Sequence, residues 1–174
     1  MRMFQIHEFN EHAIDALLEG IIHDATREER IMMLFGILDN MLKTAWLSGL
    51  NEDNVRQREC VQAAVDVVNF LKSNLGVHKD PLFNAAYKRF YTTIHRKIID
   101  AYKNENNEEF QTIRASVTKL TSPPFSKAFF SNFTRESAID DGEILRYLLS
   151  PNAKNAVLSS GAYSGARSVQ HTSH

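Results

Sequence analysis

Hydrophobic residues recur every three or four positions along most of this chain, which is the spacing of one face of an α-helix. The pattern is strongest between residues 27 and 120, and it breaks at polar turns, at Gly76 and at the pair Pro123 and Pro124. Alternating strand patterns and hairpin dipeptides are almost absent. The pattern therefore predicts an all-α fold.

Short polar connections separate the expected helices. These helices are expected at residues 8–22, 27–47, 55–75, 81–102 and 110–120. Because connections of a few residues favour antiparallel neighbours, we predict an antiparallel helical bundle of four to five helices within residues 1–122. Its core is expected to contain Phe35, Leu38, Val65, Val68, Leu71, Ile94 and Ile98.

Several helix boundaries have recognisable signals. Thr26 and Glu29 have the spacing of a capping box, in which each residue bonds the backbone of the other at the start of a helix. Gly49 suits the position just past the end of that helix, and Gly20 suits the end of the first one. The second expected helix is therefore well delimited.

Residues 123–174 differ in composition and are predicted to form a C-terminal extension. The extension opens with phenylalanines among small polar residues, at positions 125, 129, 130 and 133. A short helix is expected at 143–149, and a loose Ser-, Ala-, Gly- and Asn-rich end is expected after Pro151. The apolar helix should either pack permanently on the bundle or lie in a groove that a partner would also occupy.

The expected helix at 27–47 carries more hydrophobic side chains than one core face needs. An additional helix-binding surface would use Met32, Met33, Ile37 and Met41, since flexible methionines suit an adaptable surface. The alternative for the two adjacent methionines is burial against the first helix or the C-terminal extension. The two interpretations are compatible if a covering segment moves aside for a partner.

Composition narrows the possible functions. The 174 residues are 43% hydrophobic, enough for one domain with a sizeable core, and their formal charge of -1 argues against nucleic-acid binding by bulk charge. Cys60 is the single cysteine, which excludes an intramolecular disulfide. The sequence has no signal-peptide pattern and no apolar run long enough to span a membrane, so we expect a cytoplasmic protein.

One short pattern suggests chemistry. Arg89 and His95, separated by five residues, resemble the motif of HEPN ribonucleases, in which the arginine would hold phosphate and the histidine would assist proton transfer. The polar residue usual after the arginine is replaced here by Phe90. The simpler interpretation is that both residues lie on the surface beside an apolar stripe. A HEPN-like RNA-cleaving domain therefore remains the alternative function.

Other catalytic or ligand-binding patterns are missing. The histidines at 7, 12, 23, 78 and 95 have no partner at the spacing of a helical metal site. The chain also has no Gly-rich phosphate loop and no nucleophile elbow. We therefore expect no catalytic residues, no metal and no cofactor, which favours a binding protein over an enzyme.

Three segments, in order and with compatible spacing, resemble the FliS family of flagellin-export chaperones. They are 25-ATREERIMMLF-35, 61-VQAAVDVVNFLKSNL-75 and 90-FYTTIHRKIIDAYKNENNEEFQTI-113. The residues that fall on family positions include Ala25, Thr26, Glu29, Met33, Leu34, Phe35, Ala64, Val68, Leu71, Phe90, Tyr91, Arg96 and Ala101. The chain departs from the family at Thr93, where a tyrosine is usual, and in its C-terminal extension, which has no counterpart.

The resemblance implies an antiparallel helical bundle that acts as a cytoplasmic chaperone. Its partner would be the disordered C-terminal segment of flagellin, which it would protect from premature polymerisation and deliver for export. The resemblance also leaves open an adaptor or co-chaperone role with another flagellar export protein. A client helix would lie in an apolar groove between bundle helices, to which the four side chains at positions 32, 33, 37 and 41 would contribute.

Overall fold

The computed structural model describes residues 2–75, 81–122 and 141–159, and every regular element in these ranges is an α-helix. The helices are α1 (Arg2–Asp24), α2 (Arg27–Leu50), α3 (Asn54–Leu75), α4 (Pro81–Lys103), α5 (Asn107–Thr121), α7 (Asp141–Leu148) and α8 (Pro151–Ser159). The predicted all-α bundle with a C-terminal helical tail is confirmed.

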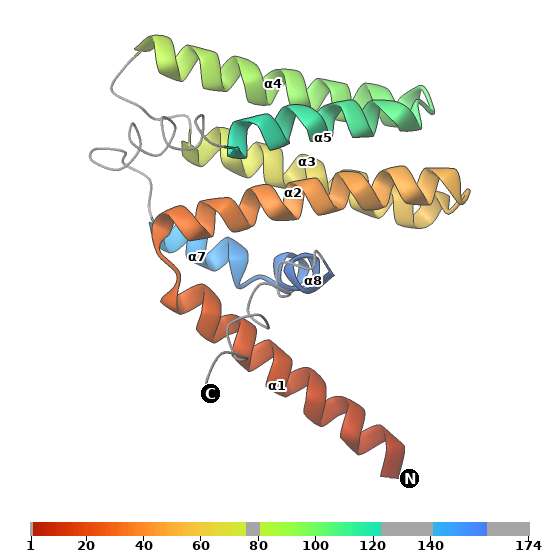
Figure 1. Cartoon of the computed structure of the whole chain (residues 1–174), viewed down its shortest axis with the longest axis vertical. Coiled ribbons are helices and arrows are strands. Elements are labelled where there is room, and N and C mark those ends of the chain that lie inside the picture. The colour runs from red at the N-terminus through yellow and green to blue at the C-terminus, as the bar shows by residue number, and fades with distance from the viewer. Residues whose placement is uncertain (1, 76–80, 123–140, 160–174) are drawn as a thin grey trace, which may run out of the picture.

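Helices α2, α3, α4 and α5 form an antiparallel four-helix bundle (Figure 1). Within it, α2 packs on α3 and α5, and α4 packs on α3 and α5. Each helix therefore has two neighbours and buries one continuous apolar stripe. All seven predicted core residues are buried, among them Leu38 and Val68, which are at most 1% exposed.

The start of α2 is fixed by the predicted capping box. The backbone N–H of Thr26 donates to Glu29 Oε2 at 2.7 Å, and the backbone N–H of Glu29 donates to Thr26 Oγ1 at 3.2 Å. Two N–H groups that no helical carbonyl could satisfy are thereby paired. Hydrogen bonds from the backbone N–H and the side chain of Thr26 lower the pKa of the Glu29 carboxyl.

Two glycines predicted at helix ends lie inside helices instead. Helix α1 continues through Gly20 to Asp24, and α2 continues through Gly49 to Leu50. A Cβ atom at position 49 would collide with the side chains of Gln57 and Asn107, so Gly49 permits the close approach of three helices. Packing, rather than helix termination, accounts for this glycine.

A second layer of helices covers the side of α2 that faces away from α5. Helices α7 and α8 both pack on α2, and α1 packs on α7 (Figure 1). We predict a boundary between the bundle and the C-terminal extension at residue 122. In the structure, helix α7 of the extension contacts the N-terminal helix α1. Leu18 and Ile22 of α1, with Ile144 and Leu148 of α7, are at most 1% exposed and belong to the same hydrophobic cluster as the bundle core.

The chain after Pro151 was predicted to be loose, but Pro151–Ser159 is helix α8. Proline suits the first turn of a helix, where its missing N–H costs nothing. Ala153 and Ala156 are buried, so docking stabilises a helix too short to persist alone. The four phenylalanines of the extension and the chain end after 159 lie outside the described residues.

Candidate functional site

A cleft of about 930 Å³ lies between the bundle and the C-terminal helices. Side chains of α2 and α3 form one side of it, and side chains of α7 and α8 form the other. Helix α8 rests on α2 rather than on α3, so the space between α8 and α3 is left open. The cleft is lined by Ile37 and Met41, two of the residues predicted to bind a client.

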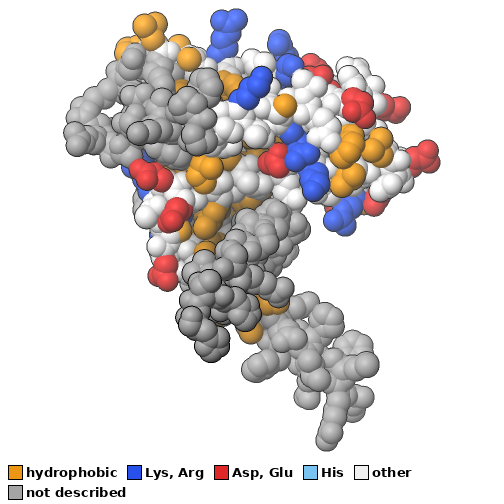
Figure 2. Space-filling view, in the orientation of Figure 1, with side chains coloured by type: hydrophobic (Ala, Val, Ile, Leu, Met, Phe, Trp, Pro, Cys, Tyr) orange, Lys and Arg blue, Asp and Glu red, His pale blue; other side chains and the backbone are white. Residues whose placement is uncertain are grey.

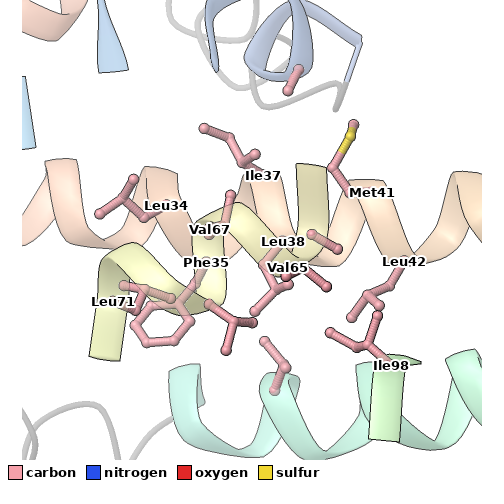
Figure 3. Packing of buried hydrophobic residues seen from close by; sticks show 14 of the residues in the cluster. Leu34, Phe35, Ile37, Leu38, Met41, Leu42, Val65, Val67, Leu71 and Ile98 are labelled. Atoms are coloured by element: carbon pink, nitrogen blue, oxygen red, sulfur yellow. The ribbon is translucent and has the colours of Figure 1, made fainter. Parts of the chain in front are cut away.

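The floor of the cleft is apolar. Ile37 and Met41 of α2 point toward α8, on the side of the helix opposite Leu38 and Leu42 (Figure 3). From α3, the cleft is lined by Cys60, Ala63 and Val67, which repeat at helical spacing. Two neighbouring helices therefore present a second apolar stripe outside the four-helix core.

The rim of the cleft is polar along α3. Arg56, Glu59, Gln62 and Asp66 stand along this wall, and the Gln62 side-chain amide donates to Asp66 Oδ1 at 2.9 Å. An apolar floor with a charged rim complements an amphipathic helix, whose apolar face enters the groove while its polar face stays in water.

Helix α7 closes one end of the cleft through an aromatic contact. The ring of Tyr147 stacks on that of Phe70, with centroids 4.4 Å apart and planes inclined by 26°. Burial raises the pKa of Tyr147 to about 12, and the nearby carboxylate of Asp66 adds to the effect. The hydroxyl therefore remains neutral at physiological pH, and the stacked pair ties α7 to α3.

The four predicted client-binding residues do not share one surface. Ile37 and Met41 are 2% and 8% exposed, and both line the cleft beneath the C-terminal helices. Met33 is partly buried against the core cluster, and one helical turn separates it from Ile37 on the same side of α2. Met32 lies on another side of the helix and is 37% exposed. The candidate site therefore includes Ile37 and Met41, and Met33 lies next to it on α2.

Sequence reasoning missed the contribution of α3. Cys60, Ala63 and Val67 lie beside the stripe that was assigned to the core. Their spacing could have revealed a second apolar stripe, but the small side chains of Cys60 and Ala63 contribute little hydrophobic surface to it. Burial also raises the pKa of the Cys60 thiol, which reduces its reactivity.

A separate group of hydrophobic residues is exposed where α2 meets α3. Leu47, Leu50 and Val55 are 40%, 53% and 61% exposed. Figure 2 shows hydrophobic side chains on the surface at this end of the bundle. None of the three lines the cleft, so they are not part of the candidate site.

Arg89 and His95 both lie on α4. Arg89 is exposed and borders a shallow recess lined by Ala85, Ala86, Phe90 and Thr93, to which His95 does not contribute. The recess that Arg89 borders is therefore not shared with His95. Nearby, Lys97 pairs with Glu109 of α5 at 2.9 Å.

Within the described residues, no group of three His, Cys, Asp or Glu side chains is arranged to hold a metal ion. None of the described helices is long and apolar enough to cross a membrane. Comparisons with protein-family models, curated proteins and solved structures give no match for this chain. The resemblance to the flagellin-export chaperones therefore rests on the quoted residues alone.

Proposed function

We propose that this protein is a helix-binding export chaperone whose client is the C-terminal segment of flagellin. The client helix binds the face of α2 and α3 that Ile37, Met41 and Val67 line. The observation that carries the proposal is that this face already holds helices of the same chain beside an apolar-floored cleft of about 930 Å³. A surface that accepts one short amphipathic helix has the shape and chemistry to accept another.

The ordered resemblance of residues 25–35, 61–75 and 90–113 supports flagellin as the client. The C-terminal segment of flagellin forms helices against other flagellin copies, so its apolar face must be covered before export. The apolar strip on α2 and α3 provides such a cover. Because the strip lies outside the bundle core, a client can bind there without unfolding the four helices.

A charge placed in the cleft tests the proposal. Ala63 lines the cleft and is partly buried, so Ala63→Glu puts a carboxylate where the apolar face of the client would lie. Ala115→Glu makes the same change at an exposed position on α5 and is the matched control. Fluorescence titration with a labelled peptide of the flagellin C-terminal segment measures Kd for each variant.

We expect Ala63→Glu to weaken binding about tenfold or more, equivalent to about 1.4 kcal/mol, while Ala115→Glu binds as the parent does. Equal binding by all three proteins would exclude this face. A parallel assay of RNA cleavage by the parent and by His95→Ala addresses the alternative function. Cleavage that depends on His95, without flagellin binding, would replace the chaperone proposal.

A further inference from the structure

Helix α8 is tied to α1 by one lysine and two carboxylates. Lys154 Nζ lies 2.8 Å from Asp15 Oδ1 and 2.8 Å from Glu19 Oε1. Asp15 and Glu19 are one turn apart on α1, so both reach the same ammonium group. The contact joins residues that are 139 and 135 positions apart in the chain.

The lysine is shielded from water more than its partners are. The Lys154 side chain is 11% exposed, whereas those of Asp15 and Glu19 are each 46% exposed. Hydrogen bonds from the ammonium to both carboxylates raise the pKa of Lys154. The group therefore stays charged, and its bonds to Asp15 and Glu19 exist only while α8 remains against α1.

The other described contacts of α8 are small. Among residues 151–156, where burial is described, the buried side chains are Ala153 and Ala156, which expose little apolar surface when they leave α2. Helix α7 is anchored differently, by fully buried Ile144 and Leu148 and by the stacking of Tyr147. Movement of the C-terminal helices should therefore be confined to α8, with α7 remaining in place.

The position of α8 conflicts with client binding. Met41 is 8% exposed in a cleft whose opposite wall is α8, so a client helix cannot cover the whole strip while α8 stays there. We propose that α8 is an autoinhibitory flap over the client-binding face, held shut by the bonds of Lys154 to Asp15 and Glu19. This inference rests on the proposed function, because it assigns a regulator to the same face.

The single cysteine provides a reporter of flap opening that needs no client. Cys60 lines the cleft opposite α8 and is 8% exposed. The rate at which its thiol reacts with a maleimide should therefore follow the population in which α8 has moved away. Lys154→Met removes the charge but keeps most of the side-chain stem, and Lys119→Met is the control on the exposed end of α5.

We expect Lys154→Met to react at least about fivefold faster than the parent, and Lys119→Met to react at the parental rate. Because salt screens ion pairs, 1 M NaCl should bring the parental rate toward that of Lys154→Met. If Lys154→Met has a lower unfolding midpoint, the double variant Asp15→Asn with Glu19→Gln removes the charges of both ion pairs from the exposed partners instead. If Lys154→Met and the Asp15→Asn, Glu19→Gln variant are both labelled within twofold of the parental rate, the proposal that α8 is a flap is wrong.

Measuring the affinity for the flagellin C-terminal peptide tests the autoinhibitory role of α8 and the identity of the client separately. A closed flap reduces apparent affinity by the fraction of molecules that are open, so faster labelling should be matched by tighter binding. Faster labelling with unchanged peptide affinity would overturn autoinhibition. Faster labelling with no peptide binding by either protein would support the movable α8 and overturn the proposed client.

Discussion

Two glutamates occupy backbone positions that usually belong to glycine. Glu52 and Glu105 have φ angles of 58° and 54° and follow the ends of α2 and α4. In each turn two backbone N–H groups donate hydrogen bonds to carbonyls of the last helical turn. For example, the Asp53 N–H donates to the Ser48 carbonyl at 2.9 Å, and the Asn106 N–H donates to the Ala101 carbonyl at 2.9 Å. This is the Schellman arrangement, whose left-handed residue is strained unless it is glycine.

Glu105→Gly should therefore stabilise the protein. Relief of left-handed strain exceeds the entropy that glycine adds to the unfolded chain, so we expect a gain of about 0.5–1 kcal/mol. Thermal unfolding followed by circular dichroism measures the change. The same substitution at Glu108, in the first turn of α5, should lower the melting temperature because glycine weakens a helix.

Gly49 is required for a different reason, the contact of α2 with α3 and α5. The Gln57 side-chain amide donates to the Ala45 carbonyl at 3.2 Å and to Asn107 Oδ1 at 2.7 Å, next to the glycine. Gly49→Ala should displace this pair at a cost of about 1–3 kcal/mol, only partly offset by the helix propensity of alanine.

Gly36→Ala is the control for that prediction, because nothing lies within 4 Å of a Cβ atom at position 36. Within the same helix, this change should stabilise the protein by up to about 1 kcal/mol. Urea unfolding of both variants gives the comparison. Equal effects at positions 36 and 49 would contradict a packing role for Gly49.

At the scale of the element, α2 has two apolar sides with different neighbours. Its inner side carries Leu38 and Leu42 into the bundle, and its outer side carries Ile37 and Met41 under the C-terminal helices (Figure 3). Arg30 joins this helix to α1, since its Nε donates to the Ile22 carbonyl at 3.0 Å and its Nη2 to the His23 carbonyl at 2.9 Å. These carbonyls end α1, where a cation is favourable.

Two adjacent methionines test which side of α2 the client contacts. Met33 lies one turn before Ile37, whereas Met32 points elsewhere and is 37% exposed. We expect Met33→Glu to weaken binding of the flagellin peptide about tenfold, because the carboxylate would adjoin the apolar strip. Met32→Glu should bind within about twofold of the parent.

Melting temperatures of the two variants complete the test. A moderate decrease for Met33→Glu is expected, because Met33 packs partly on the core cluster. If Met33→Glu unfolds far earlier and the residual folded protein binds normally, Met33 belongs to the core rather than to the client surface. Weaker binding by Met32→Glu alone would place the client on another side of α2.

At the scale of the whole molecule, the fold is a four-helix bundle with an outer layer built from both ends of the chain. Helix α7 is integrated into the hydrophobic cluster through Ile144 and Leu148, while the described anchoring side chains of α8 include two alanines and Lys154. A partly exposed bidentate ion pair joins Arg114 of α5 to Asp39 of α2, with nitrogen–oxygen distances of 2.9 and 3.1 Å. Because α7 buries large apolar side chains and the described buried side chains of α8 are small, we expect α7 to contribute more than α8 to the unfolding free energy.

Two truncations separate those parts. Ending the chain after Ser150 removes α8 and should lower the unfolding free energy by no more than about 2 kcal/mol, since the described buried side chains of α8 are two alanines. Ending it after Ser122 also removes α7, and loss of buried Ile144 and Leu148 should cost several kcal/mol at about 1.5–3 kcal/mol each. Urea unfolding measures both, and equal losses would contradict the assignment of α7 as structural.

The sequence by itself determined the helices of the bundle and their buried faces. Periodic apolar residues and the Thr26 capping box act within a few positions along the chain, so local spacing is enough to recognise them. The core residues Phe35, Val68 and Ile98 follow from the same periodicity. Local signals were weaker at the ends of α1 and α2, where Gly20 and Gly49 are helical despite their low propensity.

Only the tertiary structure decided what covers the outer side of α2. The sequence showed that this helix has excess apolar side chains, but it could not show that α7 and α8 cover Ile37 and Met41 while Met32 stays exposed. It also gave no sign of α8, whose alanine- and asparagine-rich sequence becomes helical where it docks. Lys154 meets Asp15 across 139 positions, and such contacts depend on how distant segments pack rather than on any pattern along the chain.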